Sequence, residues 1–109
     1  LLFTKGNPCE QQAKIDRSGL ASYFRGVHIV KEKDVAAYQA TLSANAWDAA
    51  HCWMIGNSPK SDINPALAAG LGAVYIPHPR TWHLEHEPVP ERHERFQVVQ
   101  RFSDLRRLF

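Results

Sequence analysis

The stretch Trp53-Met54-Ile55-Gly56-Asn57-Ser58-Pro59-Lys60-Ser61-Asp62-Ile63-Asn64-Pro65-Ala66 decides the fold class of this 109-residue chain. The apolar run from Cys52 to Gly56 is typical of a buried strand. A polar segment from Asn57 to Ser61 follows, and the small residues after it predict a helix from about Asp62 to Ala69. Strand, polar turn and helix in this order indicate one unit of a parallel α/β fold.

The same alternation continues on both sides of this stretch. Helices are expected from Pro8 to about Ser18, from Val35 to about Ala44, and from a cap at Ser103 to Phe109. Short apolar runs predict further strands at Leu1 to Thr4, Gly26 to Val30, Ala73 to Ile76 and, at a sheet edge, Phe96 to Val99. Apolar runs separated by helices favour parallel strands that are buried on both faces, so we expect an α/β domain.

Length and composition exclude several classes of protein. A chain of 109 residues fits one domain, 1–109, and 44% hydrophobic with 22% charged residues is ordinary for a globular protein. A net charge of +2 is too small to indicate a nucleic-acid surface. No apolar run reaches the ~18 residues of a membrane span and no signal peptide is evident. We therefore expect a cytoplasmic protein without nucleic-acid or membrane partners, with Cys9 and Cys52 reduced.

Polar residues follow three of the expected strands, at Thr4 to Asn7, Lys31 to Asp34 and Asn57 to Asp62. Ligands of open parallel sheets bind at the carboxyl ends of the strands, where the winding reverses. Hydroxyl, ammonium and carboxylate groups together suit an anion and a metal ion. The sequence thus predicts a binding site at these strand ends.

Together these segments resemble the haloacid dehalogenase superfamily, whose members are mostly phosphatases that form an aspartyl-phosphate. The opening stretch is similar to the fourth family motif, in which Asp62 matches the last carboxylate, while Asn57 replaces the commoner Asp. Leu2-Phe3-Thr4-Lys5-Gly6-Asn7 resembles the second motif, and Glu32-Lys33-Asp34 the third. The resemblance implies catalytic roles for Thr4 and Lys33, a Mg²⁺ ligand at Asp62, and phosphate binding by Thr4, Lys33, Asn57 and Ser58.

The first motif of the family, an Asp-x-Asp pair, does not occur in these 109 residues. That motif supplies the nucleophile and the general acid/base, so the chain alone is expected to be inactive. The resemblance implies a truncated, Rossmann-like three-layer sandwich without its first, central strand, and the chain begins at Leu1 without a methionine, as a fragment would.

The missing strand would lie between Leu1 to Thr4 and Cys52 to Gly56. Without it, these neighbours would stand about 9.6 Å apart, too far for hydrogen bonds. Either the two strands close up, or another chain donates a strand. The second outcome predicts a homo-oligomer, a strand-exchanged dimer or a complementing N-terminal fragment.

Two functions from different classes follow. The first is a fragment of a Mg²⁺-dependent hydrolase of small phosphate esters, and the alternative is a non-enzymatic module that assembles through its exposed strands. A weaker idea is metal capture by the expected surface loop 77–95 through His78, His83, His86 and His93, with Glu85 and Glu87 nearby, although its four prolines favour a solvated loop.

Ordinary structural roles compete with each of these assignments. Thr4 can end a strand, Lys33 can be a solvated lysine at a helix start, and Asp62 can offset the helix dipole in a first turn. Arg80-Thr81-Trp82 could contact a ligand, but packing of the tryptophan over the sheet is favoured. Arg101-Phe102 and Arg106-Arg107 combine basic and aromatic residues as nucleic-acid binders do, but an amphipathic closing helix is favoured.

Overall fold

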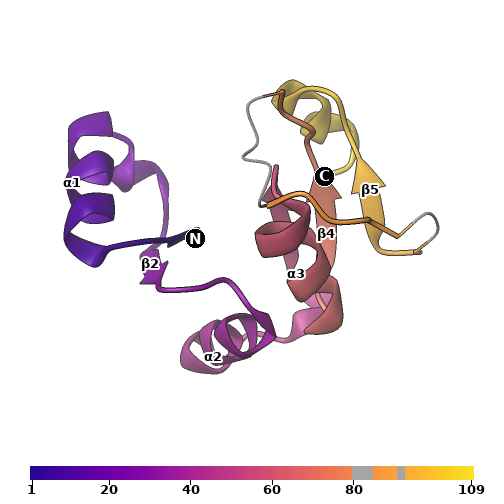
Figure 1. The fold of residues 1–109 in the computed structure, drawn as a ribbon, viewed down its shortest axis with the longest axis horizontal. Coiled ribbons are helices and arrows are strands. Elements are labelled where there is room, and N and C mark those ends of the chain that lie inside the picture. Colours follow the sequence, from indigo (N-terminus) through magenta and orange to yellow (C-terminus); the bar gives the residue numbers. More distant parts are fainter. Residues whose placement is uncertain (80–84, 91–92) are drawn as a thin grey trace. The chain divides into compact units, whose positions relative to one another are not determined.

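A computed structural model describes residues 1–79, 85–90 and 93–109 (Figure 1). These residues form two compact units, 1–33 and 34–109. Every strand pair is parallel, which confirms the predicted α/β class. Among the described residues, no helix has the length and apolar character needed to cross a membrane.

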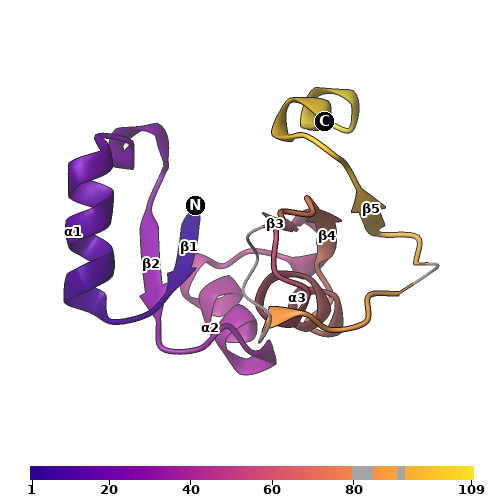
Figure 2. The same cartoon turned by 45° about the horizontal axis from the view of Figure 1, so that its top comes forward.

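The first unit is a parallel strand pair with one helix. Strand β1 (Leu2–Lys5) pairs with β2 (Val27–Val30), so that Thr4 lies opposite Ile29. Helix α1 (Pro8–Ser18) begins as predicted because the Asn7 side chain accepts hydrogen bonds from the first turn, and it ends at Gly19 in the left-handed region, with φ of 69°. Figure 2 shows this helix beside β2.

The second unit holds a sheet of order β3-β4-β5. Its strands are β3 (Trp53–Gly56), β4 (Gly72–Tyr75) and β5 (Phe96–Val98), and its helices are α2 (Val35–Asn45) and α3 (Asn64–Ala68). Helix α3 packs on β4 and contacts α2. The core of this unit consists of buried apolar side chains from α2, α3, β4 and the residues next to α3 and β4: Tyr38, Ile63, Ala66, Leu71, Ala73 and Val74.

Two helix boundaries differ from the predictions. The chain turns helical at Pro59, three residues before the expected start, through a π-helical turn (Pro59–Ile63) that leads into α3. The Ser58 side chain caps this turn, and Pro59 suits its first position because proline has no N–H to leave unpaired. The last helix is a 3₁₀ helix (Phe102–Arg107) whose cap is Arg101 rather than Ser103, since the Asp104 carboxylate accepts from the Arg101 N–H.

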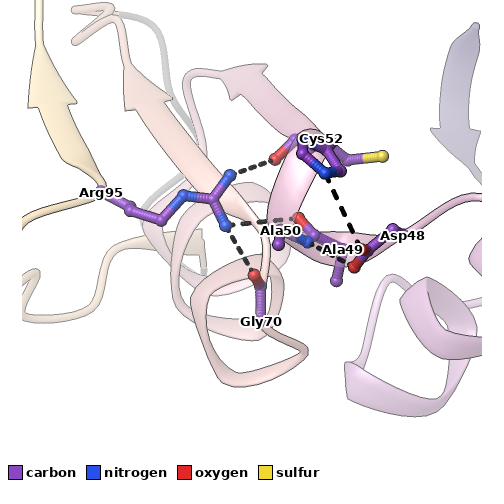
Figure 3. Close-up of polar contacts among 7 residues, drawn as sticks. Asp48, Ala49, Ala50, Cys52, Gly70 and Arg95 are labelled. Carbon is purple, nitrogen blue, oxygen red and sulfur yellow. Dashed lines mark hydrogen bonds and ion pairs between the residues drawn. The ribbon is translucent and has the colours of Figure 1, made fainter.

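Arg95 fastens three backbone segments at the start of β3. Its guanidinium donates to the carbonyl oxygens of Gly70 at 2.8 Å, Cys52 at 3.0 Å and Ala49 at 3.3 Å (Figure 3). The same group lies 5.2 Å from the ring centre of Trp53. These contacts stabilise the amino end of β3, whereas the polar turn follows its carboxyl end.

Strands β1 and β3 lie at the edges of their sheets. Within the described residues β1 pairs with β2, β3 pairs with β4, and the two pairs belong to separate sheets. Within its own sheet, each of the two strands has one backbone edge without a neighbouring strand among the described residues.

Candidate active site

Asp62 lies against the end of β3. Its side chain is only 5% exposed, and the Ser58 N–H donates to its Oδ2 at 3.2 Å. The carboxylate rests on Gly56, where an added Cβ would come within 2.5 Å of the Asp62 Cγ. Only glycine permits this approach at the last residue of the strand. The sequence thus places a buried carboxylate directly beyond a strand end.

Hydrogen bonds within the turn that contains Asp62 pair several of its own backbone groups. The Ser58 carbonyl accepts from the N–H groups of Asp62 at 2.8 Å and Ile63 at 3.1 Å, and the Ser58 Oγ accepts from the Ser61 N–H at 3.0 Å. Ser58 is buried, whereas Asn57 is exposed. Because a hydroxyl that accepts one bond still has its own proton, Ser58 remains able to donate.

Tyr38 reaches the same turn from α2. Its hydroxyl donates to the Ser61 carbonyl at 2.8 Å and also lies 3.3 Å from the Asp62 carbonyl. The ring is 3% exposed. Burial raises the pKa of the Tyr38 phenol well above its ordinary value, and the negative charge of Asp62 raises this pKa further. Tyr38 therefore stays protonated and remains a hydrogen-bond donor throughout the neutral range.

Thr4 and Lys33 belong to the first unit, at the carboxyl end of its strand pair. Thr4 is half-buried near the end of β1. Lys33 follows β2, and its Nζ lies 5.6 Å from the ring centre of Phe3 in β1. The structure thus brings Thr4 and Lys33 to one strand end and gathers Asn57, Ser58 and Asp62 at another. That all five serve one phosphoryl group stays a prediction.

Sequence reasoning missed Tyr38 and the role of Glu85. The sequence places Tyr38 only within the helix expected from Val35 to about Ala44, and Glu85 only in the expected surface loop 77–95. Glu85 is buried, with 9% exposure, and its Oε1 accepts from the Ser61 Oγ at 2.8 Å. No local pattern signals either contact, because the partners are 23 and 24 residues apart in the chain.

The histidine-rich loop gives no metal centre among the described residues, where no group of three or more His, Cys, Asp or Glu side chains is placed to hold an ion. His83 and the segment Arg80-Thr81-Trp82 lie outside the described residues. The predictions made for them stay untested.

No protein-family model and no curated protein matches this sequence. Solved structures do. A haloacid dehalogenase-like family hydrolase from Xanthomonas campestris superposes on 98% of this chain with a TM-score of 0.84 and 34% sequence identity. The chain has the fold of part of a haloacid dehalogenase-like core. It covers 46% of the Xanthomonas chain, so it spans about half the length of this hydrolase.

Two further structures share the haloacid dehalogenase-like fold of the chain. An uncharacterized protein from Listeria monocytogenes serotype 4b has a TM-score of 0.75 at 25% identity, over 90% of this chain and 60% of its own. The putative hydrolase YfnB from Bacillus subtilis, solved bound to magnesium, has a TM-score of 0.77 at 20% identity, over 98% of this chain and 48% of its own. The resemblance and the fold class drawn from the sequence are thereby confirmed.

Proposed function

We propose that this chain supplies the metal-side and phosphoryl-binding part of a Mg²⁺-dependent phosphate-ester hydrolase. The observation that carries the proposal is the buried Asp62 carboxylate, held over Gly56 by the Ser58 N–H at the end of β3. A carboxylate is costly to bury, and one kept at a strand end by a backbone donor is typical of a binding site. The Xanthomonas relative is itself a hydrolase.

The donor set at Asp62 fits magnesium. Mg²⁺ prefers oxygen ligands and is commonly bound through one or two carboxylates together with waters and substrate phosphate. Asp62 would provide one such oxygen, and Asn57 offers a neutral amide oxygen where the family commonly has a second carboxylate. Bound there, the ion supplies positive charge for the phosphoryl oxygens. The related YfnB was solved with magnesium, which agrees with this choice of ion.

The remaining residues have roles that their chemistry supports. The Thr4 hydroxyl donates to a phosphoryl oxygen, and the Lys33 ammonium neutralises the charge that spreads over the phosphoryl group during transfer. Asn57 and Ser58 offer an amide and a hydroxyl at the same strand end as Asp62. The substrate class proposed is a small phosphorylated molecule, since these groups bind phosphate and the resemblance to the family implies substrates of that kind.

Nucleophilic attack needs a group that these 109 residues do not contain, because no Asp-x-Asp pair is among them. The chain is therefore proposed to be inactive by itself. An assay of the purified chain with p-nitrophenyl phosphate and Mg²⁺ tests this directly, and we expect no turnover above background. Turnover that disappears in Asp62→Ala would show a complete active site and overturn the proposed incompleteness.

The uncovered edges of β1 and β3 favour a second candidate, a module that assembles by accepting a strand. All four residues of β3 are half-buried, whereas Gly72, Ala73 and Val74 of the neighbouring β4 are buried, which indicates that β3 has room for more cover. Sedimentation velocity at increasing concentration tests self-assembly through these strands. Dimers or larger species support it, and monomers at every concentration refute it.

A further inference from the structure

A carboxylate outside the predicted site is attached to the turn that carries Asp62. The Glu85 Oε1 accepts from the Ser61 Oγ at 2.8 Å, and Glu85 is 9% exposed. Two residues further on, the same segment is tied to the start of α3, because the Asn64 Nδ2 donates to the Glu87 Oε2 at 3.1 Å and to the Pro88 carbonyl at 3.0 Å. Residues 85–88 thus lie along the turn and the helix that follows it.

All three polar groups of Ser61 are engaged. Its N–H donates to the Ser58 Oγ, its carbonyl accepts from Tyr38, and its hydroxyl donates to Glu85. Ser61 directly precedes Asp62, so a rotation of the Ser61 backbone would move the carboxylate away from Gly56. A hydroxyl has a single proton, and giving it to a carboxylate makes a charge-assisted bond that is stronger than a neutral one.

We propose that Glu85 is a positioning residue for Asp62, which it fixes through the side chain of Ser61. Glu85 touches neither substrate nor metal in this assignment. The metal role of Asp62 rests on the proposed function, but the anchoring of the turn does not. The buried carboxylate of Glu85 is costly unless it keeps its hydrogen bond, so the loop and the turn hold each other in place.

Amide hydrogen exchange, followed by NMR on the 109-residue chain, tests the anchoring without any metal. In Glu85→Ala we expect the Asp62 and Ile63 amides, which bond to the Ser58 carbonyl, to exchange at least about tenfold faster, while amides of β4 keep their rates. Glu85→Gln retains an acceptor oxygen and is expected to restore slow exchange. Glu87→Ala removes a carboxylate from the same loop that does not bond Ser61, and it is the matched control.

A double-mutant cycle with Ser61→Ala identifies the contact. Because both substitutions break the hydrogen bond between Ser61 and Glu85, the effect of Glu85→Ala on the exchange of the Asp62 and Ile63 amides should be much smaller once Ser61 lacks its hydroxyl. Unchanged exchange in Glu85→Ala, or equal effects of Glu85→Ala and Glu87→Ala, would overturn the proposal.

Binding of Mn²⁺, a probe that substitutes for Mg²⁺, separates this inference from the proposed function. If Asp62→Ala abolishes Mn²⁺ binding, Glu85→Ala should weaken it several-fold and Glu85→Gln should restore it. Mn²⁺ affinity that is equal in Glu85→Ala and the parent would refute positioning. If the parent binds no Mn²⁺ at Asp62, the proposed metal role fails, and the exchange rates alone decide whether Glu85 anchors the turn.

Discussion

At the scale of single residues, Asp62 depends on a glycine for its position. The carboxylate occupies the space in which any larger residue at position 56 would place its Cβ. A buried carboxylate that leaves this position loses its bond from the Ser58 N–H as well. Gly56 is therefore part of the site although it has no functional group.

The first prediction concerns Gly56→Ala. The new methyl group would lie 2.5 Å from the Asp62 Cγ and 2.7 Å from its Cβ, so we expect a loss of about 1 to 3 kcal/mol in the free energy of unfolding. Urea unfolding followed by tryptophan fluorescence measures it. In an Asp62→Ala background most of the opposing atoms are gone and the cost should shrink, whereas an equal cost in both backgrounds would contradict this account.

The second prediction concerns Tyr38 and alkaline pH. The folded protein holds the Tyr38 pKa above its ordinary value near 10, so the unfolded chain loses this proton first as the pH rises. Stability is therefore complete below about pH 10 and falls above it. By pH 11 the parent should lose about 1.4 kcal/mol more than Tyr38→Phe, relative to each protein at pH 8.

Tyr38→Phe also removes the bonds to the Ser61 and Asp62 carbonyls, at a cost of about 1 to 3 kcal/mol at neutral pH. Exposed tyrosines and lysines titrate alike in both proteins and cancel from the comparison. Parallel stability curves for the two proteins between pH 8 and pH 11 would show that Tyr38 ionises freely in the folded state.

Sequence reasoning at this scale found Asp62 but not the residues that hold it. The carboxylate follows an apolar run and a polar turn, and this order can be recognised in the sequence. Tyr38 and Glu85 contact Ser61 at sequence separations of 23 and 24 residues, and such contacts depend on how the elements pack. Their residue types, an aromatic on a helix and an acid in a proline-rich loop, suggest ordinary core and solvent positions.

At the scale of elements, the strand-turn-helix order was predictable because each boundary has its own chemistry. Asn7 and Gly19 mark the two ends of α1, and Asp34 caps α2, which begins at Val35 as predicted. The start of the helix after β3 was placed three residues late because the polar residues 57–61 look like a loop. Ser58 and Pro59 are a cap and a first helical residue, and they begin a π-helical turn there.

The third prediction belongs to the end of β3 that is opposite the site. Arg95 donates to the carbonyls of Ala49, Cys52 and Gly70. Lysine cannot make the same set of bonds, because its ammonium lacks the planar array of donors of a guanidinium. Arg95→Lys should lower the urea midpoint by an amount equivalent to about 1 to 3 kcal/mol, with the m-value unchanged. Arg106→Lys, at an exposed position of the last helix, serves as the control and should change the midpoint little. Equal midpoints for both variants would show that Arg95 does not hold these segments.

At the scale of the whole molecule, the chain covers 46% of the Xanthomonas hydrolase, and its segments resemble the second, third and fourth family motifs but not the first. The parallel class was predictable from the apolar runs. Which side chains enter one site was not predictable, because that depends on contacts between residues far apart in the chain, such as Ser61 and Glu85.

The most direct test of the central claim is paramagnetic broadening of ¹⁵N-labelled chain by substoichiometric Mn²⁺, which reveals even weak binding. The account predicts that amides from Gly56 to Asp62 broaden first, that Asp62→Asn abolishes this effect, and that Asp34→Asn, at the exposed cap of α2, leaves it intact. Broadening that survives Asp62→Asn, or that centres on His78, His86 and His93, would contradict the assignment of Asp62 to the metal.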